Sequence, residues 1–126
     1  MRIRIGIVIC FLASCANPTN EVRDLDTIDR FEVQFINDKD TLAYVETDTA
    51  VINQFKSVLK EKTETVDCRS TGSIYFKNGE QVKFSSYFSV GSECPFLFFE
   101  NKQGYRLNYK TGVYLDNIMT RLKRKR

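Results

Sequence analysis

The chain has 126 residues, with 19 Lys or Arg, 16 Asp or Glu and no His, which gives a formal net charge of +3 at pH 7. The absence of histidine excludes Ser-His-Asp and Cys-His catalysis and the common zinc sites. The near balance of charges is unlike that of a nucleic-acid-binding protein, so we expect no nucleic-acid partner. We also expect no cofactor.

The first 14 residues have the features of a secretory signal peptide. Arg2 and Arg4 form a basic start, and residues 5–12 (IGIVICFL) are apolar and uncharged. This run is too short to cross a bilayer, which takes roughly 20 apolar residues, but it fits the hydrophobic region of an export signal. The sequence therefore predicts a signal peptide over residues 1–14.

The residues Leu12-Ala13-Ser14-Cys15 resemble the lipobox of bacterial lipoproteins, which has an aliphatic residue, two small residues and then cysteine. The resemblance implies cleavage before Cys15 and lipidation of its thiol and its freed amine. Two or more acyl chains would hold the mature protein stably on a membrane. Ala16, which is not acidic, follows the cysteine, so we expect an extracytoplasmic protein on the outer membrane rather than the inner one.

Two cysteines remain once the signal peptide and the lipid anchor are assigned. Cys10 leaves with the signal, and Cys15 is expected to carry lipid. Cys68 and Cys94 then lie in an oxidising compartment, which predicts one disulfide between them, with two free thiols as the alternative. Two thiols without histidine do not predict a metal site.

The charge of the mature chain is unevenly distributed. Seventeen basic residues remain after residues 1–14 are removed, and five of them lie within residues 121–126, which leaves 12 basic against 16 acidic residues elsewhere. The basic tail has two interpretations. It complements the dipole of a helix that ends there, or it contacts anionic lipid headgroups.

Residues 15–29 are polar, contain Pro18 and follow no regular period, which predicts a tether before a single domain over residues 30–126. Alternating apolar residues then predict strands at residues 30–37 and 41–46.

Asp48 is expected to cap a helix over residues 49–62, where apolar side chains form one stripe at helical spacing. The helix is expected to pack this stripe on a sheet.

A hairpin is predicted around Asn78-Gly79, between strands at residues 73–77 and 81–90. A three-residue loop of residues 77–79 would pair Ile74 with Val82 and keep the apolar residues on one face. We therefore expect that loop, with Gly79 in the left-handed conformation.

The last third of the chain predicts two strands and a helix. Residues 95–100 (PFLFFE) are apolar on both faces, as in a central or double-covered strand. Residues 105–110 alternate, and residues 112–123 have helical spacing with Thr111 as a cap. The order β-β-α-β-β-β-β-α with short connections predicts a two-layer α+β domain of about six antiparallel strands, with both helices on one face.

No spacing of residues predicts a catalytic or metal site. Aromatic side chains are instead expected on the sheet face opposite the helices, and Tyr75, Tyr87 and Phe99 are the candidates for a partner-binding surface. Scattered exposed aromatics without a common role are the alternative interpretation.

These features favour a non-catalytic accessory lipoprotein that binds a protein of the cell envelope. Two alternatives remain. One is a small envelope hydrolase that uses carboxylates as acid and base. The other is a binder of a small ligand, with its pocket between the helix layer and the sheet.

Overall fold

The computed structural model describes residues 21–37 and 39–124. The predicted signal peptide, Cys15 with its expected lipid and the last two basic residues lie outside the described residues. In chain order the elements are a short 3₁₀ turn (Leu25–Thr27), strands β1 (Arg30–Asn37) and β2 (Asp40–Glu46), helix α1 (Thr49–Val58), strands β3 (Glu64–Thr65), β4 (Gly72–Asn78), β5 (Gln81–Ser89), β6 (Phe96–Phe98) and β7 (Gln103–Arg106), and helix α2 (Tyr109–Arg124).

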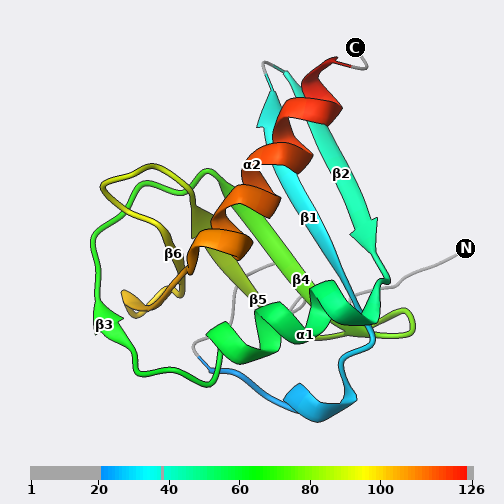
Figure 1. Ribbon diagram of the computed structural model, residues 1–126, viewed down its shortest axis with the longest axis vertical. Coiled ribbons are helices and arrows are strands. Elements are labelled where there is room, and N and C mark those ends of the chain that lie inside the picture. The colour runs from blue at the N-terminus through cyan, green and yellow to red at the C-terminus, as the bar shows by residue number, and fades with distance from the viewer. Residues whose placement is uncertain (1–20, 38, 125–126) are drawn as a thin grey trace, which may run out of the picture.

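The strands form one antiparallel sheet in the order β2-β1-β4-β5-β6-β7-β3. Both helices lie in front of one face of this sheet (Figure 1), so the predicted two-layer α+β fold is confirmed. The two-residue strand β3 was not predicted, because two polar residues carry no recognisable period. Neither helix in the described part of the chain is long and apolar enough to cross a membrane.

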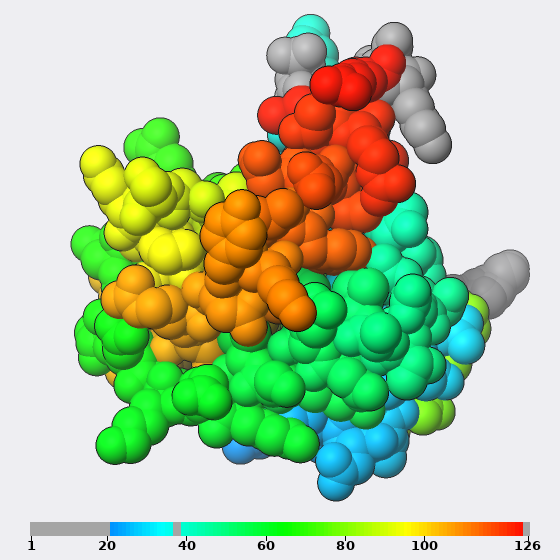
Figure 2. All heavy atoms as spheres, viewed as in Figure 1, coloured from blue at the N-terminus to red at the C-terminus, as the bar shows by residue number. Residues whose placement is uncertain are grey.

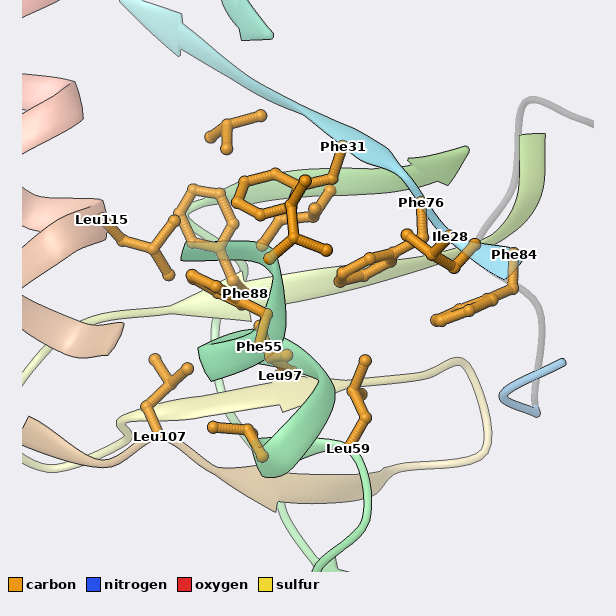
Figure 3. Packing of buried hydrophobic residues seen from close by; sticks show 14 of the residues in the cluster. Ile28, Phe31, Phe55, Leu59, Phe76, Phe84, Phe88, Leu97, Leu107 and Leu115 are labelled. Atoms are coloured by element: carbon orange, nitrogen blue, oxygen red, sulfur yellow. The ribbon is translucent and has the colours of Figure 1, made fainter. Parts of the chain in front are cut away.

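The main hydrophobic core lies between the helices and the inner face of the sheet (Figure 3). Phenylalanines dominate it: the ring centroids of Phe31 and Phe55 lie 4.8 Å apart, and Phe76 and Phe84 stack at 4.7 Å. The strands contribute Phe31, Val33, Phe35, Ile74, Phe76, Phe84, Phe88 and Leu97, and the helical segments contribute Ile52, Phe55, Val58, Leu59, Leu115 and Met119.

Helix α1 begins where the sequence predicts. The Asp48 carboxylate accepts a hydrogen bond from the backbone N–H of Ala50 at 2.9 Å, which caps the first turn. The helix ends at Val58 rather than Lys62, because the backbone N–H of Lys60 turns to the carbonyl of Ser57 at 3.2 Å and tightens the last turn.

Helix α2 begins at Tyr109, earlier than predicted, and its cap is Asn108 rather than Thr111. The Asn108 side chain accepts from the backbone N–H of Thr111 at 2.9 Å, and the Thr111 hydroxyl accepts from the backbone N–H of Asn108 at 3.1 Å. This reciprocal pair satisfies two backbone donors and is the reason that the helix starts there.

The β4–β5 hairpin has a different register from the predicted one. Asn78 pairs with Gln81 around a two-residue turn, so the expected three-residue loop is wrong. Gly79 has a φ of 59°, the left-handed conformation that the sequence predicts. A bulge at Lys83 then shifts the register by one residue and returns the following apolar side chains to the inner face.

Strand β6 lies between β5 and β7, and Phe96, Leu97 and Phe98 are all buried. The prediction of a central strand that is covered on both faces is therefore confirmed.

Part of the segment expected to be a tether belongs to the domain. Ile28 is buried in the main core, and Val22 and Leu25 pack against that core. The backbone N–H of Asp29 donates to the carbonyl of Lys77 at 3.0 Å, which ties this segment to β4. Three apolar residues in a polar stretch are too few to reveal this packing in advance.

Candidate functional site

The sheet face turned away from the helices, which we call the outer face, is formed by alternate residues of the central strands. In β1, β4 and β5 the phenylalanines and Ile74 point into the main core, so their neighbours point outward. The central positions of the outer face are held by Glu32, Gln34, Ser73, Tyr75, Lys77, Ser85 and Tyr87.

One half of the outer face is covered by the chain segment between β3 and β4. Val66 from this segment packs with Phe96 and Phe98 in a second buried cluster, against which Cys68 and Cys94 are packed. The cover is close, because a Cβ atom added at Gly104 of β7 would lie 2.9 Å from a methyl carbon of Val66. This half of the face is therefore closed to a partner.

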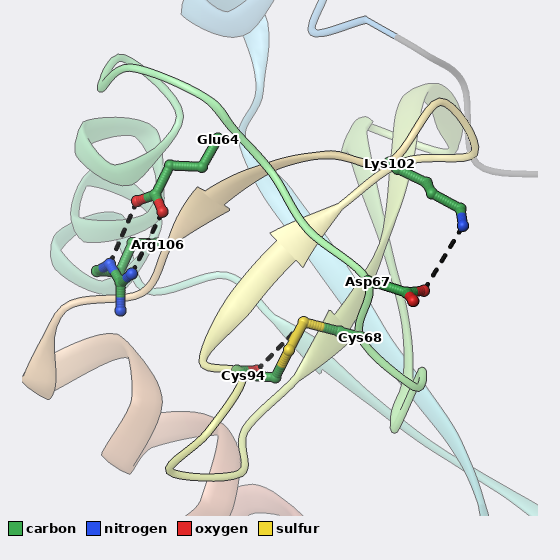
Figure 4. The surroundings of a disulfide bond; sticks show 6 residues. All are labelled: Glu64, Asp67, Cys68, Cys94, Lys102 and Arg106. Carbon is green, nitrogen blue, oxygen red and sulfur yellow. Dashed lines mark hydrogen bonds and ion pairs between the residues drawn. A yellow bond between two sulfur atoms is a disulfide. The ribbon is translucent and has the colours of Figure 1, made fainter.

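A disulfide between Cys68 and Cys94 fastens this cover to the sheet (Figure 4). The two α-carbons lie 5.8 Å apart, within the range that a disulfide spans. The predicted pairing is therefore confirmed. The bond joins the covering segment to the loop that leads into β6.

The other half of the outer face is open. Tyr75 and Tyr87 lie there and are half-buried. Ile36 is 72% exposed and Val45 is 48% exposed, and both lie on the same face in β1 and β2. We call the area bounded by Ile36, Val45, Tyr75 and Tyr87 the open patch.

Phe99 is not part of the open patch, so this part of the expected partner surface is wrong. Its side chain is 3% exposed and lies in the main core. The reason is the alternation of side chains along the chain: Phe98 points to the outer face, and the next residue therefore points inward. The Phe99 ring meets Tyr105 edge to face at 6.1 Å.

A half-buried ion pair lies within the open patch. The ammonium of Lys77 is 2.9 Å from one carboxylate oxygen of Glu32, and the amide of Gln34 donates to the other at 2.7 Å. Burial alone would raise the pKa of Glu32, but the hydrogen bonds from Lys77 and Gln34 outweigh it, so this pKa lies below its ordinary value. The carboxylate therefore stays charged and is held in one orientation.

Tyr87 is held in a similar way at the boundary with the covered half. Its hydroxyl donates to the carboxylate of Glu100 at 2.5 Å, and its ring lies 5.5 Å from that of Phe98. This hydrogen bond, with some burial, raises the pKa of Tyr87. The ring is thus a fixed feature of the surface.

A second buried carboxylate, which the sequence did not reveal, lies on the helix side of the sheet. Glu46 is 9% exposed and accepts a 2.7 Å hydrogen bond from the hydroxyl of Tyr114 in α2. Its other oxygen accepts from the backbone N–H groups of Thr47 and Asp48. Burial, and next the hydrogen bond to Glu46, raise the pKa of Tyr114. The pair joins α2 to the end of β2.

An open depression of about 430 Å³ lies at one end of the open patch. The side chains of Gln34, Ser70, Thr71 and Ser73 give it polar but uncharged walls, and Ile36 stands at its rim. Such a lining offers hydrogen bonds but no group suited to acid–base chemistry.

Among the described residues, no three His, Cys, Asp or Glu side chains come together in a way that could hold a metal ion. Comparison of the chain with protein-family models, with curated proteins and with solved structures found no match.

Proposed function

We propose that this chain is a lipid-anchored lipoprotein of the bacterial cell envelope, whose domain binds another envelope protein without catalysing a reaction. The lipobox-like residues 12–15 support export and anchoring through Cys15. The disulfide between Cys68 and Cys94 supports an oxidising, extracytoplasmic location, because such bonds rarely persist in the cytoplasm. The neutral Ala16 supports the outer membrane.

The observation that carries the binding role is the division of the outer face. One half is sealed by a disulfide-fastened segment, and the other half leaves Ile36, Val45, Tyr75 and Tyr87 accessible. Tyrosines are enriched in protein interfaces, and accessible tyrosines and apolar residues on one face are typical of them. Held in place by Lys77 and Gln34, Glu32 gives that surface a defined hydrogen-bonding centre.

The contacts of the carboxylates support a non-catalytic role. Glu46 is bound by Tyr114 and by two backbone N–H groups, and Glu100 by Tyr87. Glu64, which borders a cavity below α1, lies 3.3 Å from Arg106. A general acid or base needs a carboxyl group that is free to exchange its proton with a substrate.

The anchoring is tested by Cys15→Ser in the producing cell. We expect the variant to incorporate no labelled fatty acid and to accumulate as unprocessed precursor, while the parent chain is labelled and retained with the membrane. Normal processing and membrane retention of the variant would contradict the anchor.

The binding surface is tested by placing a photo-crosslinking phenylalanine derivative at position 75 in the intact envelope. We expect a discrete adduct from this position. The same derivative in place of Asn53, an exposed residue of α1, is the matched control and is expected to give none. Equal adducts from both positions, or no adduct from position 75, would overturn the assignment of the surface.

A further inference from the structure

The end of α2 and the tip of the β1–β2 hairpin lie together at one end of the molecule (Figure 1). Figure 2 shows the last turn of α2 projecting beyond the body of the domain. This projecting end is not part of the open patch described above, except that Ile36 belongs to both.

The last turns of α2 carry a group of exposed cations. Arg121, Lys123 and Arg124 are exposed, and Leu122 between them packs against the main core. The guanidinium of Arg121 lies 5.7 Å from the ring centroid of Tyr44, and the ammonium of Lys123 lies 6.0 Å from that of Phe35. The cations therefore have fixed positions over the hairpin, because the helix is docked by its apolar side.

These cations are not neutralised by carboxylates in the described part of the chain, since every ion pair found there involves other residues. Among the described residues, this end carries Arg121, Lys123 and Arg124 of α2 and Lys39 of the hairpin, against Asp40. The net charge of this end is therefore strongly positive, whereas the rest of the mature chain is acidic.

An apolar side chain accompanies the charge. Ile36 is 72% exposed and lies opposite Thr41 near the tip of the hairpin. Its side chain is on the outer face and α2 is on the other face, so a surface reaches both only when it meets this end of the domain end-on (Figure 1). A soluble acidic protein would need only the cations. A bilayer surface offers both anionic headgroups for the cations and an apolar layer just beneath them for the isoleucine.

We propose that this end of the domain, formed by Ile36, Arg121, Lys123 and Arg124, is a contact site for the surface of an anionic phospholipid bilayer. It would act as a second attachment that orients the domain, in addition to any lipid on the chain. The proposal is independent of lipidation, because the site consists only of side chains of the folded domain. It shares Ile36 with the open patch, whereas its three cations lie outside that patch.

Vesicle co-sedimentation tests the proposal. The protein used is residues 15–126 with Cys15→Ser, which contains every described residue and cannot be lipidated at position 15. We expect binding to vesicles of phosphatidylethanolamine and phosphatidylglycerol, little binding to phosphatidylcholine vesicles, and a decline with rising salt. Replacing the three cations, as Arg121→Gln, Lys123→Gln and Arg124→Gln, is expected to weaken binding about 100-fold, at about fivefold per cation.

Matched controls separate position from charge. The triple variant Lys60→Gln, Lys62→Gln and Arg69→Gln removes the same charge from exposed positions elsewhere and is expected to change binding less than about threefold.

The apolar contribution is tested by a second pair of variants. Ile36→Ser is expected to weaken binding several-fold, whereas Val45→Ser, on the same face but away from the tip, is expected to have no effect. Circular dichroism establishes that each variant is folded.

Three results would overturn the proposal: no binding to the anionic vesicles, equal losses in the two triple variants, or binding that Ile36→Ser leaves unchanged. The last result, together with tighter binding to soluble heparin than to vesicles, would assign the cations to an acidic macromolecule instead. None of these results bears on lipidation of Cys15, which the tested chain lacks.

Discussion

Loss of the disulfide between Cys68 and Cys94 is predicted to lower the free energy of unfolding by about 3.5 kcal/mol. The two cysteines are 26 residues apart in the sequence, so the bond closes a loop that contains the whole β4–β5 hairpin. A cross-link of this span removes about 12 cal/mol/K of entropy from the unfolded chain in the chain-entropy description, which gives this free energy at 25 °C. The double variant Cys68→Ala, Cys94→Ala removes the bond without leaving a reactive thiol.

Urea denaturation of residues 15–126 with Cys15→Ser measures the difference. With a denaturant slope of roughly 1–3 kcal/mol/M, the unfolding midpoint of the double variant is expected to fall by roughly 1–3.5 M. Arg69→Ala with Ser92→Ala is the matched control, because both residues are exposed in the same two segments. That pair is expected to stay within about 0.5 kcal/mol of the parent.

The reasoning assumes that the bond acts on the unfolded chain, because the second cluster and the backbone hydrogen bonds of Val66 and Thr71 still hold the covering segment in the double variant. A loss below about 1 kcal/mol in the double variant would refute it. So would a control pair that is as destabilised as the cysteine variant.

Three further predictions concern single side chains. Ser86→Ala is expected to raise the free energy of unfolding by about 1 kcal/mol, because the Ser86 hydroxyl is fully buried in the core with no hydrogen-bond partner among the described residues; any destabilisation in urea would contradict this. Tyr114→Phe is expected to cost about 1–2 kcal/mol, since it removes the hydrogen bond from the Tyr114 hydroxyl to the buried side chain of Glu46; an unchanged urea midpoint would contradict this. The pKa of Glu32 is lower in the folded state than its ordinary value of 4.5. As the pH falls below about 4.5, the unfolded chain therefore takes up a proton at Glu32 before the folded chain does, and the free energy of unfolding decreases. Glu32→Gln is therefore expected to flatten the fall in stability below about pH 4.5 in acid titrations, and an unchanged acid profile would contradict the lowered pKa.

Several elements could be predicted because their signals are local. The alternation in β1, the apolar run of β6 and the Asp48 cap of α1 each depend on residues within one segment. The disulfide was also predictable, since only two cysteines remained once the signal and the anchor were assigned.

Other features depend on pairing between segments that are distant in sequence. Alternation along β1 places Glu32 on the outer face, but Lys77 falls in the predicted hairpin loop. The contact between them depends on the β1–β4 register, which no local pattern contains. Glu46 and Tyr114 are 68 residues apart and meet only because α2 crosses the end of β2. The bulge at Lys83 likewise depends on pairing. Without it, the two-residue turn would pair Phe76 with Lys83 and turn Phe84 away from the inner face.

The two edges of the sheet differ in a way that bears on self-association. An edge strand exposes backbone N–H and C=O groups to which a strand of another chain can add. At one edge β3 offers two residues, but at the other β2 runs over seven residues and pairs only with β1 among the described strands. Thr41, Ala43 and Val45 of β2 are all exposed and uncharged, so they do not repel an incoming strand. Domain swapping or fibril formation by this protein would therefore start at β2, before the edge at β3.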